Sequence, residues 1–128
     1  MAYCFSTLSP KGFKETLETV KGRLAEAGFG ILSEIDVTAK FKEKLGVDFR
    51  EYRILGACNP SYAYQALSAE PYIGTMLPCN VIVQQWEDGR VEVSAIDPVA
   101  SMQAIENPHL KDTALIIRSK LEDVIAAI

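Results

Sequence analysis

Two short segments place a cysteine beside an asparagine at the border of a predicted helix or strand. Cys58 and Asn59 directly precede Pro60, and Cys79 and Asn80 directly follow another proline. The unpaired N–H groups and the dipole at a helix N-terminus favour negative charge, so Cys58 is expected to have a lowered pKa or to lie near a bound anion. The two segments mark a candidate ligand site, although neither is a known catalytic signature.

The two thiols have alternative interpretations that the sequence leaves open. Cys58 and Cys79 are too far apart in the chain for a Cys-x-x-Cys redox motif or a zinc knuckle. If they meet in space, they could bind a soft metal or form a reversible disulfide. Free cysteine is also among the most buried residue types, so both could be small hydrophobic core residues.

Two carboxylates form a further candidate. Glu34 and Asp36 alternate with Ile35 and Val37 in a predicted strand, so both carboxylates lie on one face. Neighbouring carboxylates can share a proton or hold a cation. The alternatives are a solvent-facing edge strand and, for Asp36, a cap on the helix that follows. We include both residues in the candidate ligand site.

The remaining motifs support no assignable reaction. His109 is the single histidine and lies in the first turn of the last predicted helix, off its apolar stripe, which indicates a surface residue. A lone histidine makes no metal site unless carboxylates or thiols converge on it. The chain has no Gly-x-Ser-x-Gly elbow, Walker motif or dinucleotide fingerprint. We expect no metal site, assign no cofactor and leave catalysis open.

Composition and charge are typical of one globular domain over residues 1–128. The chain has 128 residues, of which 48% are hydrophobic and 23% are charged, enough for a single core. The net charge of −4 and a pI near 5.0 argue against nucleic acid or a membrane surface as partner. The basic side chains between positions 40 and 53 fit a solvated helix face.

The cellular compartment is predicted from segments that are missing and from the cysteines. The N-terminus lacks a basic segment followed by an apolar run of signal-peptide length, and no apolar stretch is long enough to span a membrane. The 3 cysteines form no close pair, so we expect no disulfide framework. These observations favour a cytoplasmic protein with reduced thiols.

Proline residues predict four helix starts, because at four places a good N-cap residue directly precedes proline, which is favoured at the first helical position. The first of these helices ends at Gly28, and the last carries an apolar stripe from Leu110 to Ile128. The four starts are Ser9-Pro10, Asn59-Pro60, Asp97-Pro98 and Asn107-Pro108.

A shorter helix is expected from Thr38 to Leu45, ending at Gly46, with Phe41 and Leu45 directed inward. Its start is not marked by proline.

Strands are expected in the gaps between these helices. Asp88-Gly89 predicts a two-residue hairpin turn, so at least one strand pair is antiparallel. Strands and helices alternate irregularly, which favours an α+β fold: a single two-layer domain with a largely antiparallel sheet covered by amphipathic helices. The predicted strands are 3–8, 29–35, 52–57, 80–87 and 90–96.

The segment 71–78 is predicted to be a loop, yet it holds large apolar side chains and no charge. An exposed apolar patch of this kind is uncommon on a monomer. The segment therefore either covers the core of its own domain or belongs to a ligand pocket or a subunit contact.

Several blocks of the sequence resemble, in order and spacing, the domain of unknown function 302 family. The resemblance spans nearly the whole chain and implies a small cytoplasmic α+β protein of prokaryotes that forms homodimers and has no established role. Another branch of the family carries other residues at Cys58 and Cys79, which implies that the fold does not require the thiols. The blocks are 29–37, 42–47, 52–60, 66–67 and 77–81.

The sequence thus favours a homodimeric small-ligand-binding domain. Its pocket is expected near Cys58, Asn59, Cys79 and Asn80, together with Glu34 and Asp36. A thiol-based redox or soft-metal protein that uses the two cysteines is one alternative, and a structural or partner-binding module is the other.

Overall fold

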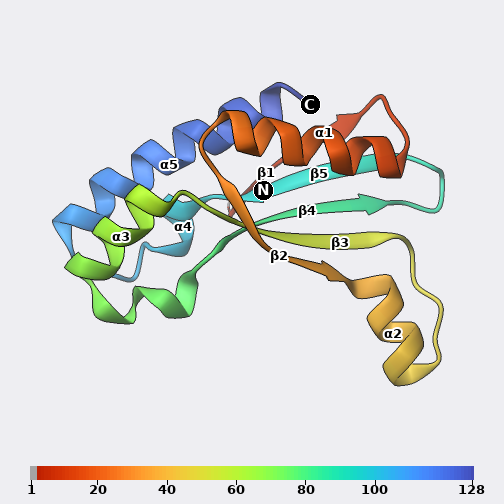
Figure 1. Ribbon diagram of the computed structural model, residues 1–128, viewed down its shortest axis with the longest axis horizontal. Coiled ribbons are helices and arrows are strands. Elements are labelled where there is room, and N and C mark those ends of the chain that lie inside the picture. Colours follow the sequence, from red (N-terminus) through yellow and green to blue (C-terminus); the bar gives the residue numbers. More distant parts are fainter. Residues whose placement is uncertain (1–2) are drawn as a thin grey trace.

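The computed structural model describes residues 3–128, which form one sheet and a set of helices around it (Figure 1). In chain order the elements are β1 (Cys4–Ser9), α1 (Phe13–Glu26), β2 (Gly30–Asp36), α2 (Val37–Leu45), β3 (Tyr52–Cys58), α3 (Pro60–Ala69), the 3-10 helix η1 (Pro71–Met76), β4 (Cys79–Gln85), β5 (Val91–Ile96), α4 (Pro98–Ser101) and α5 (Pro108–Ala126).

The sheet has five strands in the order β1-β5-β4-β3-β2, and every neighbouring pair is antiparallel. Figure 1 shows α1 and α5 on one face of this sheet, whereas α2 and η1 lie beside its two ends. The predicted α+β fold, with an antiparallel sheet covered by helices, is confirmed. None of the helices among residues 3–128 is long and apolar enough to cross a membrane.

Two apolar clusters support this arrangement. In the larger one, alternate strand residues such as Leu55, Val81 and Val93 pack against the stripes of α1 and α5. The smaller cluster joins Ala66 of α3, Ile73 of η1 and Leu110 of α5.

Part of the apolar segment 71–78 covers the core of its own domain. Ile73 of η1 is 0% exposed and packs in the smaller cluster. Tyr72, by contrast, is 80% exposed. The sequence left open whether Ile73 covers the core of its own domain or lies at a pocket or a subunit contact. Its burial in the smaller cluster shows that it covers the core.

Three of the four predicted helix caps are confirmed. The side chains of Asn59, Asp97 and Asn107 each accept a hydrogen bond from a backbone N–H in the first turn of the next helix. The prediction at Ser9 is wrong, because Ser9 pairs with Val91 in the sheet. The Ser9 hydroxyl instead forms hydrogen bonds with the Thr16 hydroxyl and the Lys11 N–H.

The short helix α2 confirms one prediction and overturns another. Asp36 caps it by accepting a hydrogen bond from the Ala39 N–H at 2.9 Å, and Gly46 ends it with a φ of 66°. Leu45, expected to point inward, is 68% exposed, because α2 extends away from the sheet (Figure 1). Phe41 instead makes an edge contact with Phe49, at 5.1 Å between ring centroids.

The hairpin between β4 and β5 is present, but its turn is longer than predicted. The Trp86 N–H donates to the Arg90 carbonyl, and the Gly89 N–H donates to the Trp86 carbonyl. Three residues therefore separate Trp86 from Arg90, the two residues that close the turn. Gly89, the last of the three, takes a φ of 90°. A three-residue loop with glycine in the left-handed region is a common hairpin connection.

Gly56 in β3 permits a close approach that is important for the site described next. A Cβ at this position would overlap Ser33 Oγ and lie 2.7 Å from Pro78 Cγ. Pro78 can therefore lie against the strand only where no side chain intervenes.

The Gly56→Ala substitution should lower the free energy of unfolding by about 1–3 kcal/mol, because the added methyl forces Pro78 and Ser33 apart. Gly22→Ala is the matched control, since a Cβ at Gly22 of α1 meets nothing within 4 Å. The control should raise stability by about 0.5–1 kcal/mol. Urea unfolding of both variants measures the difference, and equal midpoints would contradict the close approach.

Candidate functional site

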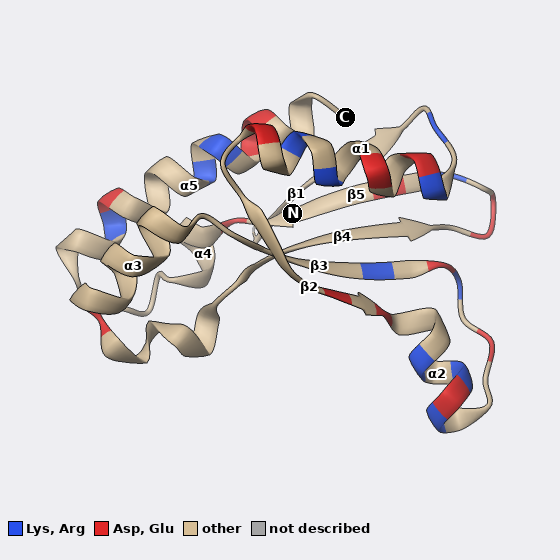
Figure 2. Cartoon of the chain, viewed as in Figure 1, with Lys and Arg blue, Asp and Glu red and all other residues tan. Residues whose placement is uncertain are grey.

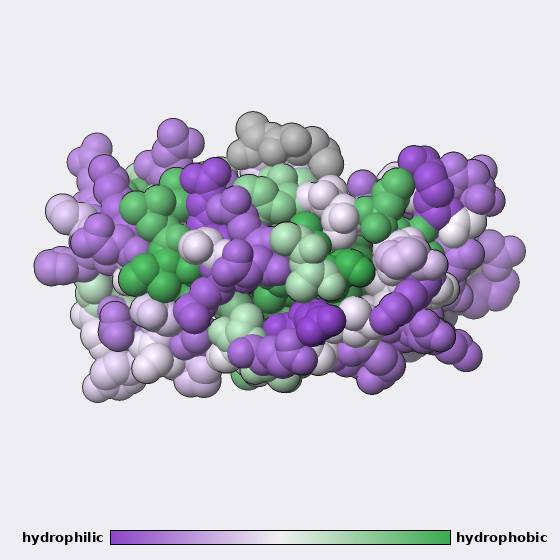
Figure 3. Space-filling view, turned by 90° about the horizontal axis from the view of Figure 1, so that it is seen from above, coloured by the Kyte–Doolittle hydropathy of each residue, from purple (hydrophilic) through white to green (hydrophobic). Residues whose placement is uncertain are grey.

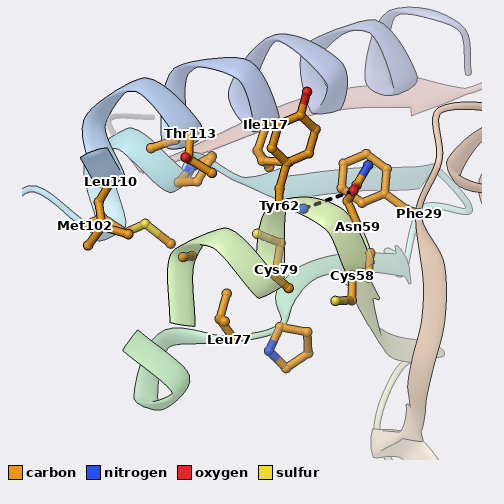
Figure 4. Close-up of a pocket in the computed structure, with 16 residues that line it drawn as sticks. Phe29, Cys58, Asn59, Tyr62, Leu77, Cys79, Met102, Leu110, Thr113 and Ile117 are labelled. Carbon is orange, nitrogen blue, oxygen red and sulfur yellow. Dashed lines mark hydrogen bonds between the residues drawn. The ribbon is translucent and has the colours of Figure 1, made fainter. Parts of the chain in front are cut away.

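An apolar cavity lies where α3 and α5 meet the ends of β3 and β4 (Figure 4). The room open to the centres of water-sized molecules is about 40 Å³. On this measure one water needs about 10–15 Å³, so the cavity admits roughly three waters or an apolar group of similar size. Its lining residues are Phe29, Ala57, Cys58, Asn59, Tyr62, Ala63, Ala66, Leu77, Pro78, Cys79, Pro98, Met102, Leu110, Thr113, Ala114 and Ile117.

The Asn59 cap directs α3 along one side of the cavity. Asn59 Oδ1 accepts a hydrogen bond from the Tyr62 N–H at 3.3 Å, and Pro60 occupies the first helical position. With the helix start held in this way, Tyr62, Ala63 and Ala66 all line the cavity. The cap therefore fixes the wall that α3 contributes.

Small side chains explain why the hollow exists. Ala57 of β3, Ala63 and Ala66 of α3, and Ala114 of α5 approach the same space from three elements. An alanine extends only one carbon from the backbone, so the facing elements meet without filling the space between them.

The cavity wall carries no charged side chain among the residues that the structure describes. Two of its polar groups already have partners: Asn59 Oδ1 serves as the helix cap, and the Thr113 hydroxyl donates to the His109 carbonyl at 3.1 Å. Figure 2 shows that α3 and η1, at this end of the molecule, are almost free of charged residues. Such a cavity favours an uncharged, apolar occupant, because a buried charge without a partner is costly.

Cys58 and Cys79 both line the cavity, a proximity that the sequence left open. Ala57 pairs with Cys79 across the two strands. Because neighbouring residues in a strand point to opposite faces, the two sulfurs approach the cavity from different sides (Figure 4).

The thiols are neutral at physiological pH. Burial raises the pKa of Cys58. Burial, and then the proximity of Cys58, raises the pKa of Cys79 to about 11. The expectation of a lowered Cys58 pKa is therefore wrong: loss of hydration dominates, and no cation in the cavity wall offsets it.

The other predicted site residues lie elsewhere. Asn80 is exposed and pairs with Gly56 on the face of the sheet away from α1 and α5. Glu34 is ion-paired with Lys21 of α1 and with Arg53 of β3, each at 2.7 Å. Arg53 also pairs with Asp36 at 3.2 Å. The structure brings none of these three predicted residues to the cavity.

Ion pairing explains the position of the two carboxylates. The hydrogen bond from Lys21, followed by that from Arg53, lowers the pKa of Glu34 against the effect of burial. Glu34 is thus held in its ionised form, and its ion pairs tie β2 to α1 and β3.

The sequence interpretation missed most of the wall. Met102, Leu110, Thr113 and Ile117 come from α5 and the end of α4. Leu110 and Ile117 belong to the apolar stripe that the sequence predicted, but the stripe could not show that part of it faces a hollow. No signal in the sequence marked Met102 or Thr113. Among residues 3–128, no group of three or more His, Cys, Asp or Glu side chains could hold a metal ion.

Comparisons with known proteins match the chain to a protein family and to a solved structure. A family model described as "Domain of unknown function DUF302" matches residues 5–128. The chain is also similar to a solved structure, the crystal structure of an uncharacterized conserved DUF302 protein from Bacillus stearothermophilus. The TM-score is 0.89 at 30% identity, over 97% of this chain and 96% of that chain. No curated protein matches the chain.

The burial of Cys79 predicts a pH dependence of stability. Its folded-state pKa of about 11 exceeds the ordinary value of 9.0, so folding favours the protonated thiol. This contribution is complete below pH 9 and is lost as the pH rises toward 11. Over that interval the wild type should lose roughly 2–3 kcal/mol more unfolding free energy than Cys79→Ala.

Urea unfolding at a series of pH values measures the two curves. Cys4→Ala, which removes a thiol outside the cavity, is the control and should follow the wild type. Parallel curves for wild type and Cys79→Ala would show that Cys79 does not carry the effect.

Proposed function

This chain belongs to the DUF302 family, and we propose that it binds a small ligand through an uncharged apolar group held in the cavity between α3, α5 and the sheet. The observation that carries the proposal is an apolar hollow in the interior of the domain. Its lining contains no charged side chain and includes four alanines and two neutral thiols. Protein interiors are normally close-packed, and empty apolar cavities take up ligands such as xenon or benzene.

A thiol-based redox or soft-metal role is the second candidate, because both sulfurs line one cavity. The raised pKa of each thiol opposes it, since the thiolate is the reactive and metal-binding form. Binding of an apolar group uses the neutral walls as they are, and for that reason we favour it.

Homodimer formation is also part of the proposal, and the uncovered face of the sheet supports it. On this face Ile35, Ile54 and Ile82 are cross-strand neighbours on β2, β3 and β4. The row continues through Ser94 and Ser6, whose hydroxyls are 2.7 Å apart, so it contains no charge. The outer face of an antiparallel sheet is usually polar and solvated, whereas interface centres are depleted of charge.

A second copy of the chain suits this face better than a charged partner does. The uncharged row from Ile35 to Ser6 can pair with itself around a twofold axis without like-charge repulsion.

The three unpaired cysteines support a cytoplasmic location, where thiols stay reduced.

Filling the cavity should abolish uptake of a small apolar probe. Under xenon pressure, methyl NMR resonances of Ala57, Ala66, Ala114 and Ile117 should shift in the wild type. Ala114→Leu places additional carbons in the hollow and should remove these shifts. Ala126→Leu, on the exposed side of α5, should leave them unchanged. Wild-type resonances that do not respond to xenon would overturn the proposal.

The dimer is tested by light scattering coupled to size-exclusion chromatography. The wild type should show twice the chain mass of 14.1 kDa. Ile82→Lys places a charge at the centre of the uncovered face and should give the monomer mass. Ile116→Lys, an exposed position on α5, should remain dimeric. A wild-type monomer across micromolar concentrations would contradict the dimer, and circular dichroism verifies that each variant is folded.

A further inference from the structure

A second hollow lies next to the cavity, as a groove between α4 and α5. The space in this groove that is open to the centres of water-sized molecules is about 310 Å³. Leu115 on its rim is 52% exposed. Figure 3 shows hydrophobic surface gathered at this end of the molecule, where the first turns of α5 lie. Its lining includes Met102, Leu110, Lys111, Ala114 and Leu115.

The groove and the cavity share one wall. Met102, Leu110 and Ala114 line both hollows. Leu110 and Ala114 are buried on α5, whereas Met102 is half-buried and follows the last residue of α4. Figure 4 shows Met102 beside Leu110 at one end of the cavity. Methionine is unbranched and adaptable, so a change in its rotamer would connect the two spaces.

The single charge in the groove is positive. Lys111 is the only charged side chain lining it, and Lys111 makes no ion pair with residues 3–128. The neighbouring Asp112 lines a separate groove on the other side of α5. In a protein of net charge −4, Lys111 thus supplies a positive charge to an otherwise uncharged groove.

We propose that the groove and the cavity together bind a medium-chain fatty acid or a similar amphipathic carboxylate. The carboxylate lies on Lys111, the chain follows the groove, and its end passes Met102 into the cavity. From Lys111 to Ile117 the helix rises about 9 Å, close to the length of an extended chain of eight carbons. This inference rests on the proposed function, because the cavity must admit an apolar group.

Isothermal titration with octanoate, octan-1-ol and octylammonium, below micelle-forming concentrations, tests the ligand class. Octanoate should bind more tightly than the alcohol, and octylammonium least tightly. Affinity for carboxylates should rise roughly fourfold for each methylene from hexanoate to octanoate. Lys111→Gln should weaken octanoate binding about two- to fivefold and leave the alcohol unchanged. Lys120→Gln, more than two turns further along α5, should have no effect.

A second variant tests the passage at Met102. Met102→Ala opens the passage and should shift the preference toward decanoate, whereas a preference unchanged from the wild type would contradict a passage at Met102. Failure of octanoate to bind would overturn the fatty-acid proposal, as would equal binding of octanoate and octanol that does not depend on Lys111. If xenon still shifts the cavity methyl resonances in that case, the apolar cavity site stands. If xenon also fails, both proposals fall.

Discussion

The length of α5 relative to the sheet is the constraint on which the rest of the structure depends. The helix has 19 residues and measures about 28 Å, whereas a strand of 7 residues measures about 23 Å. The helix is also displaced toward one end of the sheet, so its first turns project beyond the strand ends (Figure 1). The apolar stripe there needs a cover other than the sheet, which α3, η1 and α4 supply.

This overhang divides the interior into two apolar clusters, and the cavity lies at their junction. Ile117 belongs to the cluster over the sheet, and Leu110 belongs to the cluster under α3 and η1. Both line the cavity. A junction between two independently packed clusters is a natural place for a hollow, because no single layer of side chains spans it. Gly56 has no side chain, so Pro78 can lie against β3 and form one wall of the cavity.

The paired charged side chains that join β2 to α1 and β3 lie away from the apolar cavity. They are Glu34, Asp36, Arg53 and Lys21. At the cavity, burial keeps both thiols protonated and the wall neutral. The cavity wall therefore offers shape and apolar contact, and Lys111 is the nearby cation in the adjoining groove.

Local rules in the sequence were sufficient for most elements, because a cap or a turn acts within a few residues. Asn59, Asp97 and Asn107 each satisfy an N–H group two or three positions away. The same rules failed at Ser9 and Leu45, where a sheet partner far along the chain and the direction of α2 decided the outcome. The cavity depended still more on tertiary packing. Alanines and cysteines from β3, β4, α3 and α5 look like ordinary core residues in sequence. Only the distances between those elements decide whether the space among them is filled, so the alternating and helical patterns predicted the fold, whereas the hollow and its neutral thiols arose from the three-dimensional packing.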